Sequence, residues 1–378
     1  MIEQIKKIRW SHYIAYIVIG LLLLFFAFFG PTDRSTQFML EKIAISIILA
    51  VSLSLVVGFL GELSLGHAGF MCVGAYLGGK ASVILQSSLG KDSVWNLILS
   101  LLVGGLVAAI CGVIIGIPAL RLRGDYLAIV TLAFGEIVRS IFLNSSDSSF
   151  GGTLGLPTPR YDRNSLYIYA FVIVLITLFI VQNFIRSKHG RAVTAIRDNE
   201  IAARSTGINI TKYKLIAFTV SAFFAGIAGV LHSFSNYTVQ SATFGYNYSI
   251  EILVMVVLGG MGNINGAIIS AALITYLDTK LSTVLTGDRA ILQNLIYALV
   301  LILIVIYNNA PALKSFRERY NFKVLFNKMF SKKDPSHRAD DAAKWDVVPT
   351  KIEMNEILSV DMKPQNLGSD KPQKGGDK

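Results

Sequence analysis

The chain has 378 residues, of which 53% are hydrophobic and only 16% are charged. Soluble domains carry about 25% charged residues, because polar groups have to cover their surface. The charged residues of this chain are also clustered, so that long apolar runs separate them. This composition excludes an ordinary soluble domain and predicts an all-α protein that crosses a lipid bilayer several times.

The net charge of +11 and the two cysteines do not change this prediction. Lys and Arg lie in loops beside the apolar runs, a distribution that indicates membrane orientation and argues against nucleic acid as a partner. Cys72 and Cys111 lie inside apolar runs, where we interpret them as small buried hydrophobic residues. Their positions predict neither a disulfide framework nor a zinc site.

The first apolar run follows a basic N-terminus. Lys6, Lys7 and Arg9 precede the apolar residues 14–29, as in a signal peptide. The residues that follow offer no cleavage site of small residues. We therefore expect an uncleaved first span over residues 11–29.

Further spans follow along the chain, because a helix needs about 20 mostly apolar residues to cross a bilayer. Towards the C-terminus, two shorter apolar pieces flank a glycine-rich break, and a final span comes after them. We predict a polytopic helical bundle with roughly 8–10 transmembrane segments, some of them broken. The predicted spans after the first are residues 38–60, 65–85, 95–117, 126–143, 166–185 and 212–235, then the short pieces 247–258 and 264–277, and the last span 290–307.

Basic residues gather in regions that an even number of predicted crossings separates. These regions are the N-terminus, residues 118–125, residues 186–214 and the segment after the last span. Because cytoplasmic loops carry an excess of Lys and Arg, we expect these regions and both chain termini in the cytoplasm. Residues 247–277 then enter and leave from the outer side, either as two spans or as a re-entrant hairpin.

The predicted organisation is one transmembrane domain followed by a tail. We expect residues 1–10 in the cytoplasm and the transmembrane domain over residues 11–308, including a cytoplasmic loop at residues 186–211. Residues 309–333 form a basic juxtamembrane segment, in which apolar residues alternate with bases. Residues 334–378 are rich in Asp, Lys, Pro and Gly, which predicts a disordered cytoplasmic tail.

Two segments interrupt the apolar pattern at membrane depth. Residues 61–67 lie between the second span and the third, and residues 259–263 break the two short pieces, within an irregular stretch that extends to Gly266. Non-helical backbone in a membrane is tolerated where protein or a watery cavity satisfies it, so both breaks are candidates for lining a solute path. The alternative is close helix packing through small residues, as in the pair Gly74 and Gly78.

Charged residues inside spans are costly in lipid and are therefore candidates for a function. Glu136 and Arg139 stand three residues apart on one predicted helix, where they can pair with each other. Glu251 stands at the outer start of the second broken unit. His67 follows the first break and is either a packed hydrogen-bonding residue or part of a path. The candidate path residues are Ser64, Gly66, His67, Glu136, Arg139, Glu251, Gly260 and Gly262.

Residues 74–81 have the spacing of a phosphate-binding loop, except that Ala81 replaces the Ser or Thr that would bind magnesium. They lie inside a predicted apolar helix with no preceding strand, so we interpret the match as a coincidence of glycine packing. The sequence shows no paired carboxylates, metal-ligand cluster or nucleophile–base pair. We therefore expect no catalytic residue and no cofactor or metal site, and any ATP that drives the protein has to bind to another chain.

The loop of residues 186–211 is the most informative stretch. Ala192, Ile196 and Glu200 recur at helical spacing, which predicts a short helix that Gly207 ends with a left-handed cap. A short helix between two spans suits docking into a groove on a partner protein. The alternative is a solvated basic loop.

Four segments resemble one known family. Residues 190–208, GRAVTAIRDNEIAARSTGI, resemble the ATPase-docking loop of ABC importer permeases, in the form of the branched-chain amino acid permease family and its LivM-type subunit. Residues 61–70, GELSLGHAGF, resemble the broken-helix segment of that family. Residues 120–139, LRLRGDYLAIVTLAFGEIVR, resemble its central signature, and residues 249–262, SIEILVMVVLGGMG, its glycine-rich turn.

This resemblance, which runs from about residue 38 to about residue 308, implies the permease subunit of an ABC importer in a bacterial inner membrane. The implied substrate is a branched-chain or related amino acid, moved inward by alternating access. The implied partners are a second related permease, two ATPase subunits that bind the ATP, and a solute-binding protein. Importer motifs generally begin Glu-Ala-Ala, whereas Ile201 interrupts that order here and blurs the register of contacts. The docking-loop residues are Gly190, Arg191, Arg197, Glu200, Ala202, Ala203 and Gly207.

Other functions remain open at this point. Similar permeases carry urea, short amides and other amino acids, and the solute-binding protein is expected to set most of the specificity. An ATP-independent secondary transporter or channel would suit the broken helices, but it would leave the loop of residues 186–211 unexplained.

Overall fold

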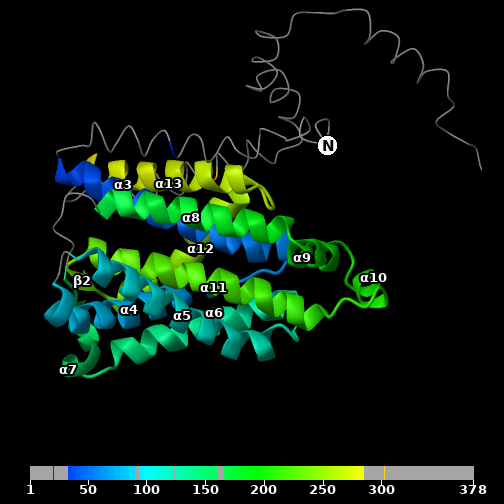
Figure 1. Ribbon diagram of the computed structural model, residues 1–378, viewed down its shortest axis with the longest axis horizontal. Coiled ribbons are helices and arrows are strands. Elements are labelled where there is room, and N and C mark those ends of the chain that lie inside the picture. Colours follow the sequence, from blue (N-terminus) through cyan, green and yellow to red (C-terminus); the bar gives the residue numbers. More distant parts are fainter. Residues whose placement is uncertain are drawn as a thin grey trace, which may run out of the picture. The chain divides into compact units, whose positions relative to one another are not determined.

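Figure 1 shows the computed structural model of the chain. The structure describes residues 33–90, 93–122, 124–159 and 166–284, together with Gly20 and Ile302. In chain order its elements are α3 (Arg34–Ser54), the π-helix η2 (Leu55–Leu60), α4 (His67–Leu89), α5 (Val94–Ala119), α6 (Asp125–Leu143), α7 (Asp147–Phe150), η3 (Gly152–Leu154), β1 (Leu156–Pro157), α8 (Leu166–Arg186), α9 (Lys188–Asp198), α10 (Glu200–Ser205), α11 (Ile210–Ser235), β2 (Thr238–Val239), η4 (Ser241–Phe244), α12 (Tyr246–Gly259) and α13 (Ile264–Val284).

Among the residues that the structure describes, six helices are long and apolar enough to cross a membrane. They are α3 with its continuation η2, then α4, α5, α6, α8 and α11. Each coincides with a span predicted from the sequence, so the polytopic helical fold class is confirmed. Apart from Gly20 and Ile302, several predicted regions lie outside the described residues: the spans 11–29 and 290–307, the N-terminal residues 1–10, the segment 309–333 and the tail 334–378.

The core lies around α11, which packs against α3, α4 and α5. The apolar window of α3 is 89% buried, against 33% for α5 and for α6, so α3 is central and these two helices are peripheral. Leu106 on α5, Ile137 on α6 and Phe179 on α8 point outward and are exposed. Such outward apolar faces suit contact with lipid or with another subunit, as a membrane protein requires.

Facing glycines allow α4, α5 and α11 to approach closely. A Cβ atom on Gly74 would lie 2.2 Å from the carbonyl oxygen of Gly226, and one on Gly226 would lie 2.6 Å from that of Gly104. Residues 74–81, which imitate a phosphate-binding loop in sequence, therefore lie within α4 in tight contact with α11. Their glycines serve helix packing.

The loops at one end of the bundle are tied together by a short sheet. β1 pairs with β2 in antiparallel fashion, with Leu156 opposite Val239. The Tyr76 hydroxyl donates to the Val239 carbonyl oxygen at 3.1 Å, and its ring stacks on Phe142 with centroids 4.2 Å apart. We call this the β2 end, and the opposite end, which carries α9 and α10, the α9 end (Figure 1).

Candidate functional site

The first helix break joins α3 to α4. The π-helix η2 ends at Gly61, whose φ of 78° is left-handed, and residues without regular structure follow until α4 begins. The Leu65 N–H donates to Thr131 Oγ1 on α6 at 3.0 Å, and the Ala68 N–H donates to Ser249 Oγ on α12 at 3.1 Å. Neighbouring helices thus satisfy backbone groups of the break, which is what non-helical backbone at membrane depth requires.

Three predicted path residues lie in this break. Ser64 is buried, and Gly66 is so close to α6 that an added Cβ would lie 2.3 Å from the carbonyl oxygen of Thr131. His67 Nε2 lies 2.8 Å from Ser52 Oγ. The Ser52 hydroxyl oxygen also lies 2.9 Å from the Leu49 carbonyl oxygen, one turn earlier in α3. His67 therefore holds the start of α4 against α3, and the path role of these residues stays a prediction.

The second break lies where the sequence predicted it. Residues 260–263 lie between α12 and α13, and the second short piece begins at residue 264 as predicted. Gly260 and Gly262 have φ angles of 90° and 80°, and these left-handed conformations turn the chain. Asn263 caps the start of α13, because its side-chain oxygen accepts the Gly266 N–H at 3.3 Å.

The docking loop, residues 186–211, contains two helices where the sequence predicted one. The chain is extended at Asn199, with φ of −158°, and this residue separates α9 from α10. Its side-chain oxygen accepts the Ala202 N–H at 3.0 Å, an N-cap that starts a new helix in place of continuing the old one. Gly207 ends α10 as predicted, with φ of 83° and its N–H donated to the Arg204 carbonyl oxygen at 3.0 Å.

The other predicted docking residues fall into a buried group and an exposed group. A Cβ on Gly190 would lie 2.1 Å from a carbonyl oxygen of α8, so the α8–α9 turn leaves no room for a side chain there. Arg191 Nη1 donates to the last carbonyl oxygen of α8 at 3.3 Å. Ala203 is buried, whereas Ala202 is exposed. Beside it Ile201 is 80% exposed, an unusual place for a large aliphatic side chain.

Arg197 joins the docking loop to both breaks. Its Nη1 atom donates to the Gly58 carbonyl oxygen in η2 at 3.0 Å, and its side chain lies so close to Gly61 that an added Cβ there would be 2.7 Å from Arg197 Cγ. A Cβ on Gly58 would in turn lie 2.4 Å from the main-chain nitrogen of Gly262. The turn between α12 and α13 therefore lies at the α9 end.

Lys214 forms a second link between the same regions. Its Nζ atom lies 2.5 Å from Glu62 Oε1 in the first break and 3.5 Å from Glu200 Oε2 in α10. The side chains of Lys214, Glu62 and Glu200 are 4%, 13% and 28% exposed. A buried ammonium group is costly unless it is paired, so these contacts hold α11, the first break and α10 to one another.

Sequence reasoning missed Lys214, Glu62 and Gly58 as site residues. A signal was present, because Glu62 stands inside a break and Lys214 is the fifth residue of an apolar helix. Nothing in the sequence pairs them, however, since 152 positions separate the two residues. Only the fold brings them together.

At the β2 end, Glu136 and Arg139 form the predicted pair. Arg139 Nε lies 2.8 Å from Glu136 Oε2, and the two side chains are about 30% exposed. The other Glu136 oxygen accepts the Tyr246 N–H at 3.0 Å, which ties α6 to the start of α12. Because exposure of a charged side chain to lipid costs free energy, this partly exposed pair on α6 requires water or protein beside it.

The predicted path residues do not form one cluster. Gly260 and Gly262 lie with Arg197 at the α9 end, the residues of the first break lie between α3, α6 and α12, and Glu136 lies beside the start of α12. Glu251 lies on α12 and is partly buried. Within the described ranges, no group of three His, Cys, Asp or Glu side chains could hold a metal ion.

Comparison with known proteins shows the family of the chain. The model of the family described as "Branched-chain amino acid transport system / permease component" matches residues 35–305, which include every element from α4 to α13. The chain belongs to this permease family. The family recognised in the sequence motifs is therefore confirmed.

Known permeases show graded similarity to the chain. The chain is 38% identical over 291 residues to the "High-affinity branched-chain amino acid transport system permease protein LivM" of Salmonella typhimurium, covering 69% of this chain and 65% of the relative. It is 37% identical over 288 residues to LivM of Escherichia coli K12, covering 68% and 66%. The match thus spans about two thirds of the length of these relatives.

A more distant relative carries a different solute in its name. The chain is 26% identical over 294 residues to the "Ribose import permease protein RbsC" of Escherichia coli K12, covering 71% of this chain and 84% of the relative. No solved structure matches the chain.

Proposed function

We propose that the chain is the membrane-embedded permease subunit of an ABC importer and moves branched-chain amino acids into the cytoplasm. The observation that carries the proposal is that the docking loop contacts the first helix break and the η2 helix before it. Arg197 donates to the Gly58 carbonyl oxygen, and Glu200 shares Lys214 of α11 with Glu62. The family and the names of the LivM relatives support the solute class. The ribose relative is a reminder that such permeases differ in solute, so urea or short amides are the alternative cargo.

The proposed partners follow from the family to which the chain belongs and from its LivM relatives. ATP binds to two separate ATPase subunits, a second homologous permease completes the solute path, and a solute-binding protein delivers the amino acid. The chain is then no enzyme, holds no cofactor, and spans a bacterial inner membrane several times. Its basic α9 end and both termini face the cytoplasm, in line with the distribution of Lys and Arg.

The mechanism is alternating access driven from the docking loop. The ATPase pair closes on ATP and displaces α10, whose exposed Ile201 and Ala202 form the contact surface. Arg197 carries that displacement to η2 through its hydrogen bond to the Gly58 carbonyl oxygen, and Lys214 carries it to the first break because it pairs with both Glu200 and Glu62. The second break follows through the close approach of Gly58 to Gly262. Coupling of this kind requires that the ATPases bind one arrangement of the permease better than the other.

An ATP-independent transporter or channel is the competing function, and affinity purification separates the two. The tagged wild-type chain and an Ile201→Asp variant are purified from the host membrane, and bound proteins are identified by mass spectrometry. We expect the wild type to bring down ATPase subunits and a second permease, and the variant to lose the ATPases alone, because a charge replaces an apolar contact.

Leu154→Asp is the matched control. Leu154 is 74% exposed at the β2 end, so the same chemical change on the opposite side should leave the ATPases bound. If the wild type retains no ATPase at all, the importer function is wrong and ATP-independent transport replaces it.

A further inference from the structure

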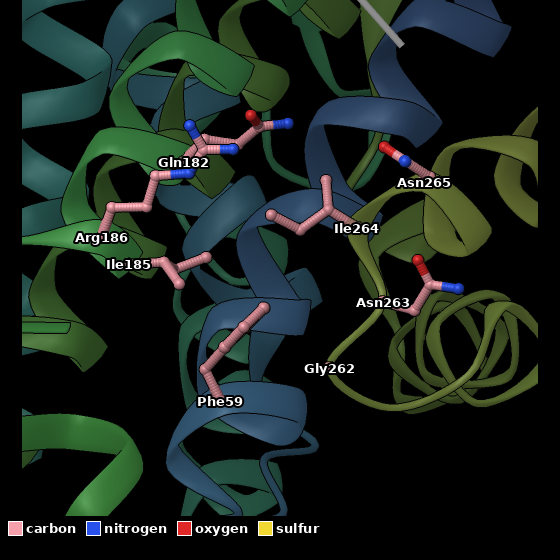
Figure 2. A pocket seen from close by; sticks show the side chains of 8 residues that line it. All are labelled: Phe59, Gln182, Ile185, Arg186, Gly262, Asn263, Ile264 and Asn265. Carbon is pink, nitrogen blue, oxygen red and sulfur yellow. The ribbon is translucent and has the colours of Figure 1, made fainter. Parts of the chain in front are cut away.

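A pocket of about 290 Å³ opens at the α9 end between α8, η2 and the second break. Figure 2 shows the side chains that line it. Arg186 and Gln182 from the last turn of α8 stand on one side, and Asn263 and Asn265 stand on the other. The function proposed above makes no use of this pocket.

The floor between these polar sides is apolar. Phe59 and Ile264 lie between the arginine and the asparagines, and Ile185 lies beside Arg186 (Figure 2). Apolar side chains would contribute nothing to the binding of a small soluble ion. A molecule with a charged or polar head and an apolar body matches both parts of the lining.

The depth of the pocket is that of a lipid head group. Arg186 is the last residue of α8, a helix of 21 residues with the composition of a membrane span, and Gln182 lies one turn before it and is 8% exposed. The pocket therefore sits where the span leaves the membrane. Basic pockets between spans at this level bind the head groups of anionic lipids.

The charge of the pocket has the matching sign. Arg186 supplies a guanidinium group, a preferred partner of phosphate, and none of the described lining residues is acidic. Lys188, two residues further on, adds to the positive charge at this end. The three side-chain amides offer further hydrogen bonds to a glycerol or phosphate oxygen.

We propose that this pocket binds the phosphate head group of an anionic phospholipid from the leaflet at the α9 end. Arg186 holds the phosphate, the asparagines bond to the glycerol part, and Phe59, Ile185 and Ile264 contact the first carbons of the acyl chains. The bound lipid bridges the two breaks, because Phe59 belongs to η2 and Asn263 to the α12–α13 turn. It also touches the root of the docking loop, since Arg191 bonds to the Arg186 carbonyl oxygen.

The test measures lipid-dependent thermal stability of the purified full-length chain in the assembly that it forms in its membrane. Phosphatidylglycerol and phosphatidylcholine are each added to detergent micelles, and the unfolding midpoint is followed against lipid concentration. We expect phosphatidylglycerol to raise the midpoint in a saturable way and phosphatidylcholine to leave it nearly unchanged, because binding to the native state alone stabilises it. The assay needs no transport or ATP hydrolysis, so its result is independent of the proposed function.

Two variants locate the effect in the pocket. Arg186→Gln should weaken the apparent affinity for phosphatidylglycerol roughly tenfold, as expected for loss of a charged hydrogen bond. Asn263→Asp keeps the helix cap, since Asp caps as well as Asn, but places a negative charge beside the phosphate and should weaken binding similarly. Lys212→Gln is the control, because this exposed lysine lies at the α9 end, in the first turn of α11, and outside the pocket.

Three results would overturn the proposal. One is an equal response to phosphatidylcholine, which would mean that the head-group charge is irrelevant. Another is the same stabilisation by inorganic phosphate or glycerol phosphate, which would make the pocket a site for a soluble anion. The third is an unchanged response to phosphatidylglycerol in Asn263→Asp, a variant whose fold the retained cap protects if Arg186→Gln fails to fold.

Discussion

The two ends of the bundle are held together by different chemistry. At the α9 end, charged side chains join segments that are far apart in the sequence, as Lys214 does with Glu62 and Glu200. At the β2 end, Glu136 also forms a charged contact, with Arg139 and the Tyr246 N–H, but the loops there are held by the pairing of β1 with β2 and by the stacking of Tyr76 on Phe142. Both ends therefore join loops to helices. Ion pairs dominate at the α9 end, whereas backbone pairing and ring stacking dominate at the β2 end.

The difference teaches where movement is possible. Lys214 has two carboxylate acceptors, at 2.5 Å and 3.5 Å. Its ammonium group can move from one carboxylate towards the other and still remain paired. A ladder of backbone hydrogen bonds and a ring stacked at 4.2 Å have one arrangement each. We infer that the α9 end transmits displacement and the β2 end stays fixed, and the following predictions test that contrast in order of decreasing effect.

The largest effect is expected for Lys214→Met. The change leaves Glu62 and Glu200 without their shared cation in a buried setting, which costs about 3–5 kcal/mol when one member of a buried pair is removed. The midpoint of thermal unfolding of the purified assembly should fall accordingly. ATPase activity in the reconstituted importer should no longer respond to solute-loaded binding protein.

Two companion variants interpret that result. Lys212→Met removes an exposed lysine from the same helix turn and should change neither quantity. Lys214→Arg keeps the cation and should restore part of the solute response. A Lys214→Met protein with wild-type stability and solute response would show that the ion pairs do not couple the loop to the break.

Gly58→Ala should have the next largest effect. Its new Cβ would meet the Gly262 nitrogen at 2.4 Å, and because the obstacle is backbone, one of the two breaks has to move. Overpacking of this kind costs about 1–3 kcal/mol. The unfolding midpoint and the solute-stimulated ATPase activity should both fall.

Gly245→Ala is the control for Gly58→Ala. Its Cβ would come no closer than 3.8 Å to another atom, and its φ of −69° suits alanine. Equal tolerance of the two substitutions would mean that the contact between the breaks is not tight in the working protein.

At the β2 end, Tyr76→Phe should lower stability and leave coupling intact. The buried hydroxyl donates to the Val239 carbonyl oxygen at 3.1 Å, and its loss costs about 1 kcal/mol while the stacked ring remains. The measurement is again the unfolding midpoint together with the ratio of stimulated to basal ATPase activity. Tyr126→Phe, at a side chain that is 69% exposed, serves as control. A changed activity ratio in Tyr76→Phe would show that the β2 end also moves.

The spans were predictable because each is a long apolar run that lipid selects directly. The glycine-rich breaks were predictable for the same reason, since they interrupt those runs. The division of the docking loop at Asn199 was not, because helical spacing continues through it and only the side-chain cap on Ala202 decides the matter. Likewise the Lys214–Glu62 pair depends on the packing of α11 against the first break, which no local pattern encodes.

The smallest effect is expected for Arg204→Ala. Arg204 Nη2 lies 3.6 Å from Glu200 Oε1, but its side chain is 68% exposed, so water screens the pair and its loss should cost less than about 0.5 kcal/mol. Unfolding of the isolated chain should therefore match the wild type. Because the same guanidinium stands on the exposed side of α10 beside Ile201, retention of the ATPases is the quantity to compare. A large loss of stability would mean that Glu200 depends on Arg204 as much as on Lys214, and the contrast between buried and exposed contacts at the α9 end would fail.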